Sequence, residues 1–185
     1  MRGFAYSCGG FRTAGTPEQR FLMGDALMDN LLQVGPWKWN MLGMGECLPY
    51  KENKVTLSKD QKDAWDMPLL QIDAEYRENE LNMQKDMVNA AMEMLDTLGF
   101  KNVRDMGERR NFGLNIHEMG TARMGRDPKT SVLNGNNQVW GTPNLFVTDG
   151  ACMTSSACQN PSLTYMALTA RAVDFAVKEL NKQNL

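Results

Sequence analysis

The fold of this chain is decided by the stretch NLFVTDGACMTSSACQNPSLTYMALTARAVDFAVKEL, residues 144–180. Its apolar run Leu145-Phe146-Val147 predicts a strand that ends at Thr148-Asp149-Gly150. Asn160 is a suitable N-cap residue, and Pro161 suits the first position of a helix. Beyond Pro161, apolar residues recur with helical spacing and predict an amphipathic helix of about five turns. The stretch therefore predicts a strand, a glycine-bearing corner and a capped helix, in that order.

The preceding part of the chain predicts a scaffold. Residues 53–57 and 69–72 predict two short strands, and residues 74–98 predict a helix that Gly99 closes as a left-handed cap. Residues 1–50 are rich in Gly and Pro and predict loops and short strands, with one helix over 18–32. From Ile116 the composition changes to glycine-rich segments around a histidine. We therefore expect two parts: residues 1–115, with loops, short strands and a long helix, and a catalytic segment, 116–185.

Composition excludes several classes of protein. The chain has 185 residues, of which 42% are hydrophobic and 23% charged, so disorder, collagen and coiled coil do not fit. Twenty Lys and Arg against 22 Asp and Glu give a net charge of −2, which argues against nucleic-acid binding. No apolar run reaches the roughly 18 residues of a membrane span, and the compartment, cytoplasm or periplasm, stays open. Four scattered cysteines and a single histidine predict free thiols and no metal site.

Three positions in the second half carry candidate chemistry, each with a structural alternative. His117 heads the segment His117-Glu-Met-Gly-Thr121 and is either a hydrogen-bonded structural residue or a base that accepts a proton near pH 7. Asp149-Gly150 is either a plain strand exit or a place where backbone N–H groups reach a ligand. Asn160 either caps its helix or lies where the helix dipole holds an anion. The residues alone leave these alternatives open.

Together these motifs resemble a known family. His117-x-x-Gly-Thr-x-x-Met-Gly, then residues 144–151 and 155–164, are similar to the C-terminal segment of glucose-methanol-choline (GMC) oxidoreductases, nearest the sugar- and polyol-oxidising branch. The specific match runs over residues 116–177, and residues 53–99 match more loosely. The resemblance implies an α+β fold, an antiparallel sheet with flanking helices, plus a C-terminal strand-helix segment that packs on an FAD-binding lobe absent from this chain.

The resemblance also implies roles for individual residues. His117 matches the catalytic histidine that faces the flavin, and Asn160 matches the second catalytic position. Residues that match positions near the FAD cofactor are Asp149, Gly150, Asn160, Pro161, Ser162 and Thr164. The implied function is the C-terminal catalytic and substrate-binding part of an FAD-dependent oxidoreductase acting on CH–OH groups of alcohols or sugars, with hydride passing to the flavin and His117 as base.

One departure from the family pattern shapes the expected partners. The glycine-rich FAD fingerprint is not found in the 185 residues. We favour a fragment of a longer enzyme over an FAD lobe supplied by another chain or a decayed copy, and we expect the chain alone to bind FAD weakly or not at all. Implied partners are a small alcohol or sugar, the FAD lobe in cis or in trans, and an electron-acceptor protein. The alternatives are a non-catalytic binding module or a subunit of a multi-chain sugar dehydrogenase.

Overall fold

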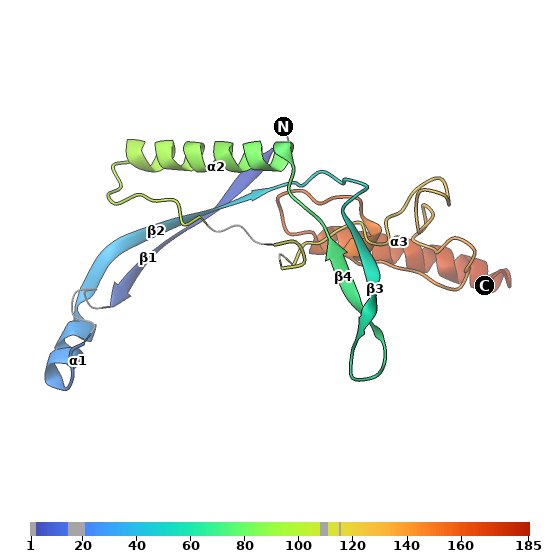
Figure 1. Cartoon of the computed structure of the whole chain (residues 1–185), viewed down its shortest axis with the longest axis horizontal. Helices are drawn as coiled ribbons and strands as arrows, with labels where there is room; N and C mark the ends of the chain where they lie inside the picture. The colour runs from blue at the N-terminus through green and yellow to red at the C-terminus, as the bar shows by residue number, and fades with distance from the viewer. Residues whose placement is uncertain (1–2, 15–20, 108–110, 115) are drawn as a thin grey trace.

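The computed structural model describes residues 3–14, 21–107, 111–114 and 116–185, which form an α+β arrangement (Figure 1). Two separate antiparallel sheets of two strands each replace the single sheet expected, within these residues. In chain order the elements are β1 (Phe4–Ala14), α1 (Asp25–Leu32), β2 (Val34–Gly45), β3 (Lys54–Lys62), β4 (Pro68–Asp73), α2 (Glu78–Thr97), the 3-10 helix η2 (Gly150–Cys152) and α3 (Ser162–Asn181).

Strands β1 and β2 form a long ribbon, so the prediction of loops and short strands for residues 1–50 is wrong. The two strands pair from Phe4 with Gly45 to Ala14 with Val34. Their glycines permit close cross-strand packing, since a Cβ added at Gly10 would lie 2.8 Å from an atom of the Trp39 ring. Helix α1 is shorter than predicted because Gly24, at φ 61°, sets its start at Asp25. Residues 18–20 of the predicted helix lie outside the described residues.

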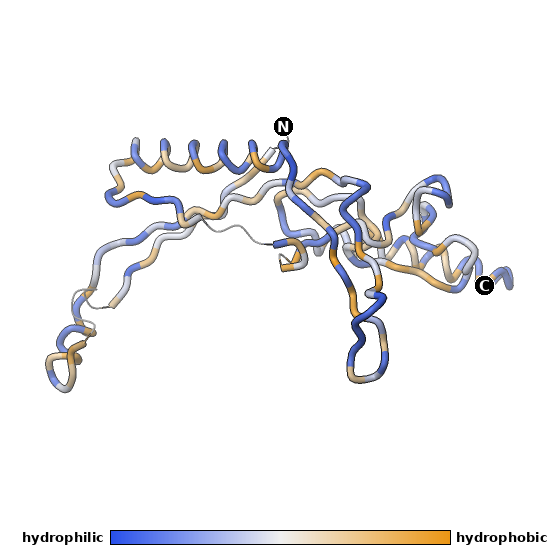
Figure 2. The backbone as a smooth tube through the Cα atoms, viewed as in Figure 1, coloured by the Kyte–Doolittle hydropathy of each residue, from blue (hydrophilic) through white to orange (hydrophobic). Residues whose placement is uncertain are grey.

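Helix α2 packs on the end of this ribbon where β1 begins and β2 ends. Its apolar side turns toward the ribbon and its polar side away (Figure 2). Met83 lies against Gly45 and Met87 against Gly43, where any side chain on the glycines would collide with the methionines. Helix α2 is followed by Gly99 at φ 77°, so the predicted helix and its left-handed cap are both confirmed.

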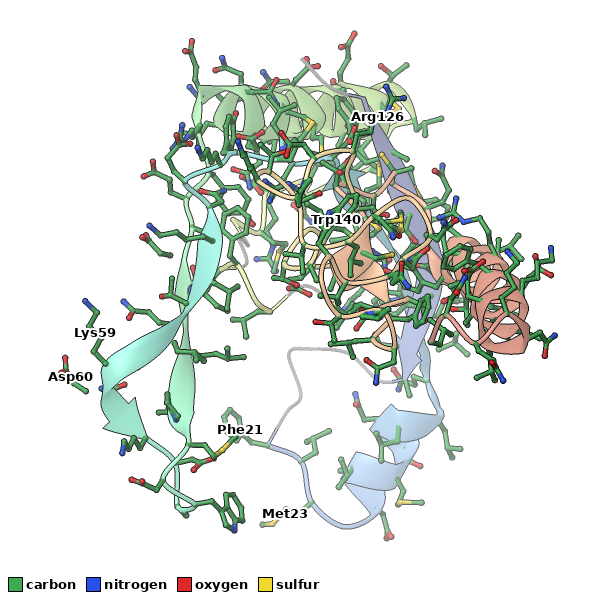
Figure 3. The ribbon with its side chains drawn as sticks, turned by 90° about the vertical axis from the view of Figure 1, so that its right-hand side faces the viewer. Phe21, Met23, Lys59, Asp60, Arg126 and Trp140 are labelled. Carbon is green, nitrogen blue, oxygen red and sulfur yellow. The ribbon has the colours of Figure 1, made fainter. Side chains whose placement is uncertain are left out.

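Strands β3 and β4 form a second ribbon, which confirms the two strands predicted for this region. They pair from Lys54 with Asp73 to Lys62 with Pro68, with an irregular register between Leu57 and Lys62. The ribbon projects on the same side of the molecule as the β1–β2 ribbon but at a different place (Figure 1). The view of Figure 3 shows Lys59 and Asp60 at its outer border, and Phe21 and Met23 beside α1 at the free end of the other ribbon.

Helix α3 follows a long segment of loops, among which Trp140 lies (Figures 1 and 3). The predicted strand at 145–147 is wrong: Phe146 makes only an isolated bridge to Gln138, because the chain turns back directly before it, with Leu145 N bonded to Thr142 O at 3.1 Å. Helix α3 is confirmed, but it begins at Ser162 with Pro161 in the cap position, so Asn160 is not its N-cap. The boundary expected at residue 115 lies outside the described residues.

The described hydrophobic core is small. Leu133 and Cys152, between which Asn137 is also fully buried, form one part, and Met83 under the ribbon and Ala172 on α3 form the others. None of the described helices is both long and apolar enough to cross a bilayer.

Candidate functional site

Backbone hydrogen bonds place residues 117–124, the histidine loop, beside η2. Ala122 N donates to Ala151 O at 3.0 Å, and Met124 N donates to Cys152 O at 2.9 Å. Gly120 lies next to the residues that follow η2, since a Cβ added to it would be 3.5 Å from the carbonyl oxygens of both Met153 and Thr154. The segment that starts at His117 therefore runs along η2, about thirty residues further on in the chain.

The start of α3 reaches the same place through Tyr165. Its hydroxyl lies 3.7 Å from the sulfur of Met119, two residues after His117. Gly150 is buried in this contact: an added Cβ would lie 2.8 Å from the Tyr165 hydroxyl and 3.0 Å from the Glu118 carbonyl oxygen. Three sequence motifs, the histidine loop, the glycine corner and the first turn of α3, therefore converge.

His117 itself is half-buried at the beginning of this loop. The residue before it, Ile116, has φ 59° and a side chain that is 87% exposed. A β-branched residue rarely adopts a positive φ, and such a conformation costs about 1–3 kcal/mol and is often found at functional sites. The imidazole thus directly follows a residue whose backbone conformation is unusual for its type.

The residues expected to line the cofactor differ in exposure. Asp149, Asn160, Ser162 and Thr164 are exposed, whereas Gly150 and Pro161 are buried. The Asp149 carboxylate accepts a hydrogen bond from Ala151 N at 3.0 Å and so caps η2. The structure brings Asp149, Gly150 and the turn after Pro161 to the histidine loop through the Tyr165 contact, and it places Asn160 directly before that turn.

Asn137 is a buried structural residue of the site that the sequence did not single out. Its side-chain nitrogen donates to Val147 O at 3.0 Å, and its side-chain oxygen accepts from Arg171 Nη2 at 3.0 Å. It has φ 64°, a conformation that asparagine tolerates better than most residues. Asn137 thereby links the segment before Asp149 to helix α3. The sequence Asn134-Gly-Asn-Asn137, typical of a turn, was the available signal.

A hollow lies elsewhere, between β3, β4 and the start of α2. It measures about 280 Å³, is open to solvent, and is lined by Glu52, Asn53, Lys54, Asp73, Ala74, Glu75 and Arg77. Arg77 is engaged there by Glu52 at 3.2 Å and Glu75 at 3.6 Å. The converging contacts around His117 are the stronger candidate, because Glu52 and Glu75 of this hollow are already engaged by Arg77.

Metal-type chemistry finds no support in the described side chains. No cluster of three or more His, Cys, Asp or Glu residues is gathered among them. The four cysteines are free. Burial, with the nearby carboxylates of Glu80 and Glu46, raises the pKa of the Cys47 thiol to about 11, and burial also raises the pKa of Cys152. Both thiols are therefore protonated and poorly nucleophilic at neutral pH.

The described residues thus define an α+β protein in which a histidine loop, a glycine corner and a helix start meet at one place. A family profile described as GMC oxidoreductase matches residues 49–169, well over half of the chain. The chain belongs to the GMC oxidoreductase family, as the motifs indicated.

Curated relatives agree with this assignment. The chain is 38% identical over 131 residues to 2-methyl-1,2-propanediol dehydrogenase of Mycolicibacterium austroafricanum, a match covering 71% of the chain and 24% of that protein. It is 29% identical to the gluconate 2-dehydrogenase flavoprotein of Pantoea cypripedii (65% and 20% covered) and 30% identical to the fructose dehydrogenase large subunit of Gluconobacter japonicus (74% and 25% covered). The match thus spans a quarter or less of the length of these relatives.

Proposed function

We propose that this chain is the C-terminal catalytic and substrate-binding part of an FAD-dependent oxidoreductase that acts on CH–OH groups of alcohols or sugars. The observation that carries the proposal is the contact of the histidine loop with both Gly150 and the first turn of α3. Family membership supports it, as do the relatives, which are named as dehydrogenases of a diol, of gluconate and of fructose. Residues 1–115 would supply scaffold and substrate contacts, and residues 116–185 the catalytic segment.

In this proposal His117 is the base and Asn160 orients the substrate. A neutral imidazole takes the proton of the substrate hydroxyl at a ring nitrogen, which is worth about 10² to 10⁴ in rate. The Asn160 amide can donate to the same hydroxyl oxygen without competing for the proton. FAD, when bound, supplies the acceptor for the hydride that leaves the carbinol carbon.

The free backbone amides at the start of α3 are suited to bind an anionic oxygen of the cofactor. Among the described residues no side chain caps α3, and the first intrahelical bond runs from Tyr165 N to Pro161 O at 3.1 Å. The amides of Ser162, Leu163 and Thr164 therefore have no intrahelical acceptor and, with the helix dipole, favour an anionic oxygen. The exposed Asp149, Asn160, Ser162 and Thr164 would contact FAD, while the buried Gly150 and Pro161 would shape the backbone that does so.

We further propose that the FAD-binding lobe lies outside these 185 residues, in cis or in trans. The chain exposes 13975 Å² of surface, whereas a compact monomer of 20.8 kDa is expected to expose about 8,900 Å². A surplus of about 5,000 Å² is the size of an extensive permanent interface. We therefore expect the chain alone to bind FAD weakly or not at all, and the complete protein, chain plus lobe, to bind it.

The experiment that tests the proposed function replaces the base in the complete protein. We expect His117→Ala to lower the rate constant of flavin reduction by an alcohol or sugar at least about 100-fold. Absorbance of bound flavin, equal to that of the wild type, serves as the control for cofactor binding. A reduction rate close to that of the wild type would show that His117 is not the base.

A second candidate function is a subunit of a multi-chain dehydrogenase that passes electrons to an acceptor protein. The name of the relative from Gluconobacter japonicus, a large subunit, favours it. Affinity purification of the complete protein from its own cells separates the two: a stoichiometric redox partner supports the multi-chain form, and a flavoprotein free of partners supports a self-contained enzyme. Sugar binding without flavin reduction would instead indicate a non-catalytic module.

A further inference from the structure

We propose that Tyr165 is a positioning residue that fixes the His117 loop against the start of α3. The inference rests on the proposed function, because it concerns how His117 and Asn160 are held at a working separation. It assigns a role to a side chain that neither contacts the substrate in our proposal nor belongs to the residues expected at the cofactor.

Tyr165 is the link in a short path of contacts between the two proposed catalytic residues. Its backbone nitrogen donates to Pro161 O at 3.1 Å, and Pro161 directly follows Asn160. Its hydroxyl lies 3.7 Å from Met119 Sδ, and Met119 is two residues from His117. One residue thus contacts the neighbours of both positions, through its backbone on one side and its side chain on the other.

The atoms around the Tyr165 hydroxyl are closely packed. A Cβ at Gly150 would lie 2.8 Å from the Tyr165 hydroxyl, 3.0 Å from Glu118 O and 3.1 Å from Met119 Sδ, so that not even a methyl group fits among them. Three residues further along the loop, Ala122 N is bonded to Ala151 O at 3.0 Å. The histidine loop therefore contacts both the backbone of η2 and the Tyr165 hydroxyl.

The Tyr165 hydroxyl is neutral when it makes this contact. Partial burial, followed by the nearby charge of Asp149, raises the pKa of Tyr165, so the hydroxyl keeps its proton at neutral pH. A displacement of about 1 Å between two groups that must act on one substrate can cost about 100-fold in rate. Removing the ring should consequently lower the rate although no reacting group is lost.

The first measurement is flavin reduction by substrate in the complete protein, with FAD bound. We expect Tyr165→Ala and Met119→Ala each to lower the rate constant about 10- to 100-fold, and the double variant to be no worse than the lower single one, because both remove the same contact. Tyr165→Phe, which removes the hydroxyl next to Met119 Sδ but keeps the ring, should lower the rate constant less than Tyr165→Ala does, and should lower it no further in a Met119→Ala background. A further loss when Tyr165→Phe is added to Met119→Ala would overturn the proposal, because the hydroxyl would then act through something other than this contact.

Phe175→Ala is the matched control. Phe175 lies on the same helix, and its ring contacts Phe146 with a centroid separation of 6.3 Å, in a contact that does not involve the histidine loop. We expect this variant to lose stability but to reduce flavin within about threefold of the wild-type rate. If Phe175→Ala slowed flavin reduction as much as Tyr165→Ala, general loosening of α3 would explain both and the positioning role would be refuted.

A second measurement does not depend on activity. The ring Cε1–H NMR signal of His117, assigned in the complete protein by its loss in His117→Gln, reports the surroundings of the imidazole. We expect the signal to shift in Tyr165→Ala and Met119→Ala and to stay in place in Phe175→Ala. An unchanged signal in Tyr165→Ala would overturn the positioning role. If instead His117→Ala keeps the wild-type rate, the proposed function fails while the NMR comparison still decides the role of Tyr165.

Discussion

Glu80 is the residue that joins the chain before β3 to the first turn of α2. It is only 3% exposed, and its carboxylate accepts hydrogen bonds from Leu48 N at 3.1 Å, Arg77 N at 3.1 Å and Asn79 Nδ2 at 3.0 Å. The bond from Arg77 N satisfies a helix-start amide in the manner of a capping box. A buried carboxylate is retained here because donors surround it.

The pKa of Glu80 shows which effect dominates. Burial by itself raises the pKa, but the hydrogen bonds from Leu48, Asn79, Arg77 and Tyr50 outweigh it, and the pKa is lowered. Because the folded pKa lies below the unfolded one, the ionised group stabilises the fold above the unfolded pKa. That contribution is lost as the pH falls through the folded pKa.

We therefore expect Glu80→Gln to destabilise the complete protein by about 1–3 kcal/mol at pH 7, since an NH₂ group replaces an oxygen that accepts hydrogen bonds. The difference from wild type should shrink as the pH falls below the unfolded pKa and through the lowered folded pKa, where the wild-type carboxylate takes up its proton. Urea unfolding at pH 7 and pH 3.5 measures both effects. The exposed Glu78→Gln, in the same helical turn, is the control and should stay within about 0.5 kcal/mol of wild type. Equal losses at both pH values would contradict the assignment.

At the scale of elements, the β1–β2 ribbon and α2 depend on close packing between glycine and methionine. A Cβ at Gly45 would lie 2.6 Å from Met83 Cε and 2.8 Å from Met83 Sδ. Met83 is itself buried, so it has little room to move. The unbranched methionine side chain fills the space that the absent glycine side chain leaves.

We expect Gly45→Val to destabilise the complete protein by about 1–3 kcal/mol through overpacking against Met83. Gly3→Val is the matched control: it lies at the same end of the ribbon, and its added Cβ would meet no atom within 4 Å. Thermal unfolding of both variants provides the comparison. If the two variants melted at the same temperature, contact between the ribbon and α2 would not be what limits stability there.

Elements that are periodic along the chain could be predicted from sequence, and elements that depend on a distant partner could not. The apolar spacing of α2 and α3 is local, and so is the left-handed Gly99. The β1–β2 ribbon was missed because its glycines, typical of loops, are explained only by Trp39 and the α2 methionines lying over them. The strand at 145–147 was predicted wrongly because the pairing of this run with residues 137–139 stays limited to a single bridge, with one backbone hydrogen bond on each side of it.

In the candidate site, too, single residues could be predicted from the sequence, whereas the contacts between distant segments could not. The sequence indicated His117, Asp149 and Asn160 as separate positions with open alternatives, and the resemblance supplied their proposed roles. The contacts that bring their segments together run through Tyr165, whose position near the start of an amphipathic helix carries no signal of function in the sequence. The catalytic assignments of His117 and Asn160 stay predictions that the experiments above decide.

At the scale of the whole molecule, exposed apolar side chains dominate the two ribbons and α3. Examples are Phe21 at 97%, Trp65 at 83% and Leu163 at 78% exposed. Three of the four tryptophans lie on the ribbons, namely Trp37, Trp39 and Trp65, while Trp140 lies among the loops with its ring nitrogen donating to Ser131 Oγ at 3.0 Å. We expect exposed apolar surface of this kind to be covered by another part of the complete protein.

We therefore expect the ribbon tryptophans to become inaccessible when the FAD lobe is present. In a Trp140→Phe variant, acrylamide should quench the fluorescence of the isolated chain several-fold more strongly than the fluorescence of the same three tryptophans in the complete protein. In every sample of the complete protein, the tryptophans of the lobe are replaced, so that only tryptophans of this chain fluoresce. The control is a variant in which Trp140 is the only tryptophan left, and its quenching should change little between the isolated chain and the complete protein. Equal quenching of the ribbon tryptophans in both forms would show that the lobe does not cover the ribbons.

The two-stranded sheets have a practical consequence for anyone who produces this polypeptide. Each described ribbon has two outer borders whose alternate N–H and C=O groups face no neighbouring strand. Backbone groups of this kind recruit any extended peptide, and the most abundant one in a producing cell is another copy of the same chain. Expressed by itself, the polypeptide should self-associate increasingly as its concentration rises, whereas co-expression with the FAD lobe should suppress this association.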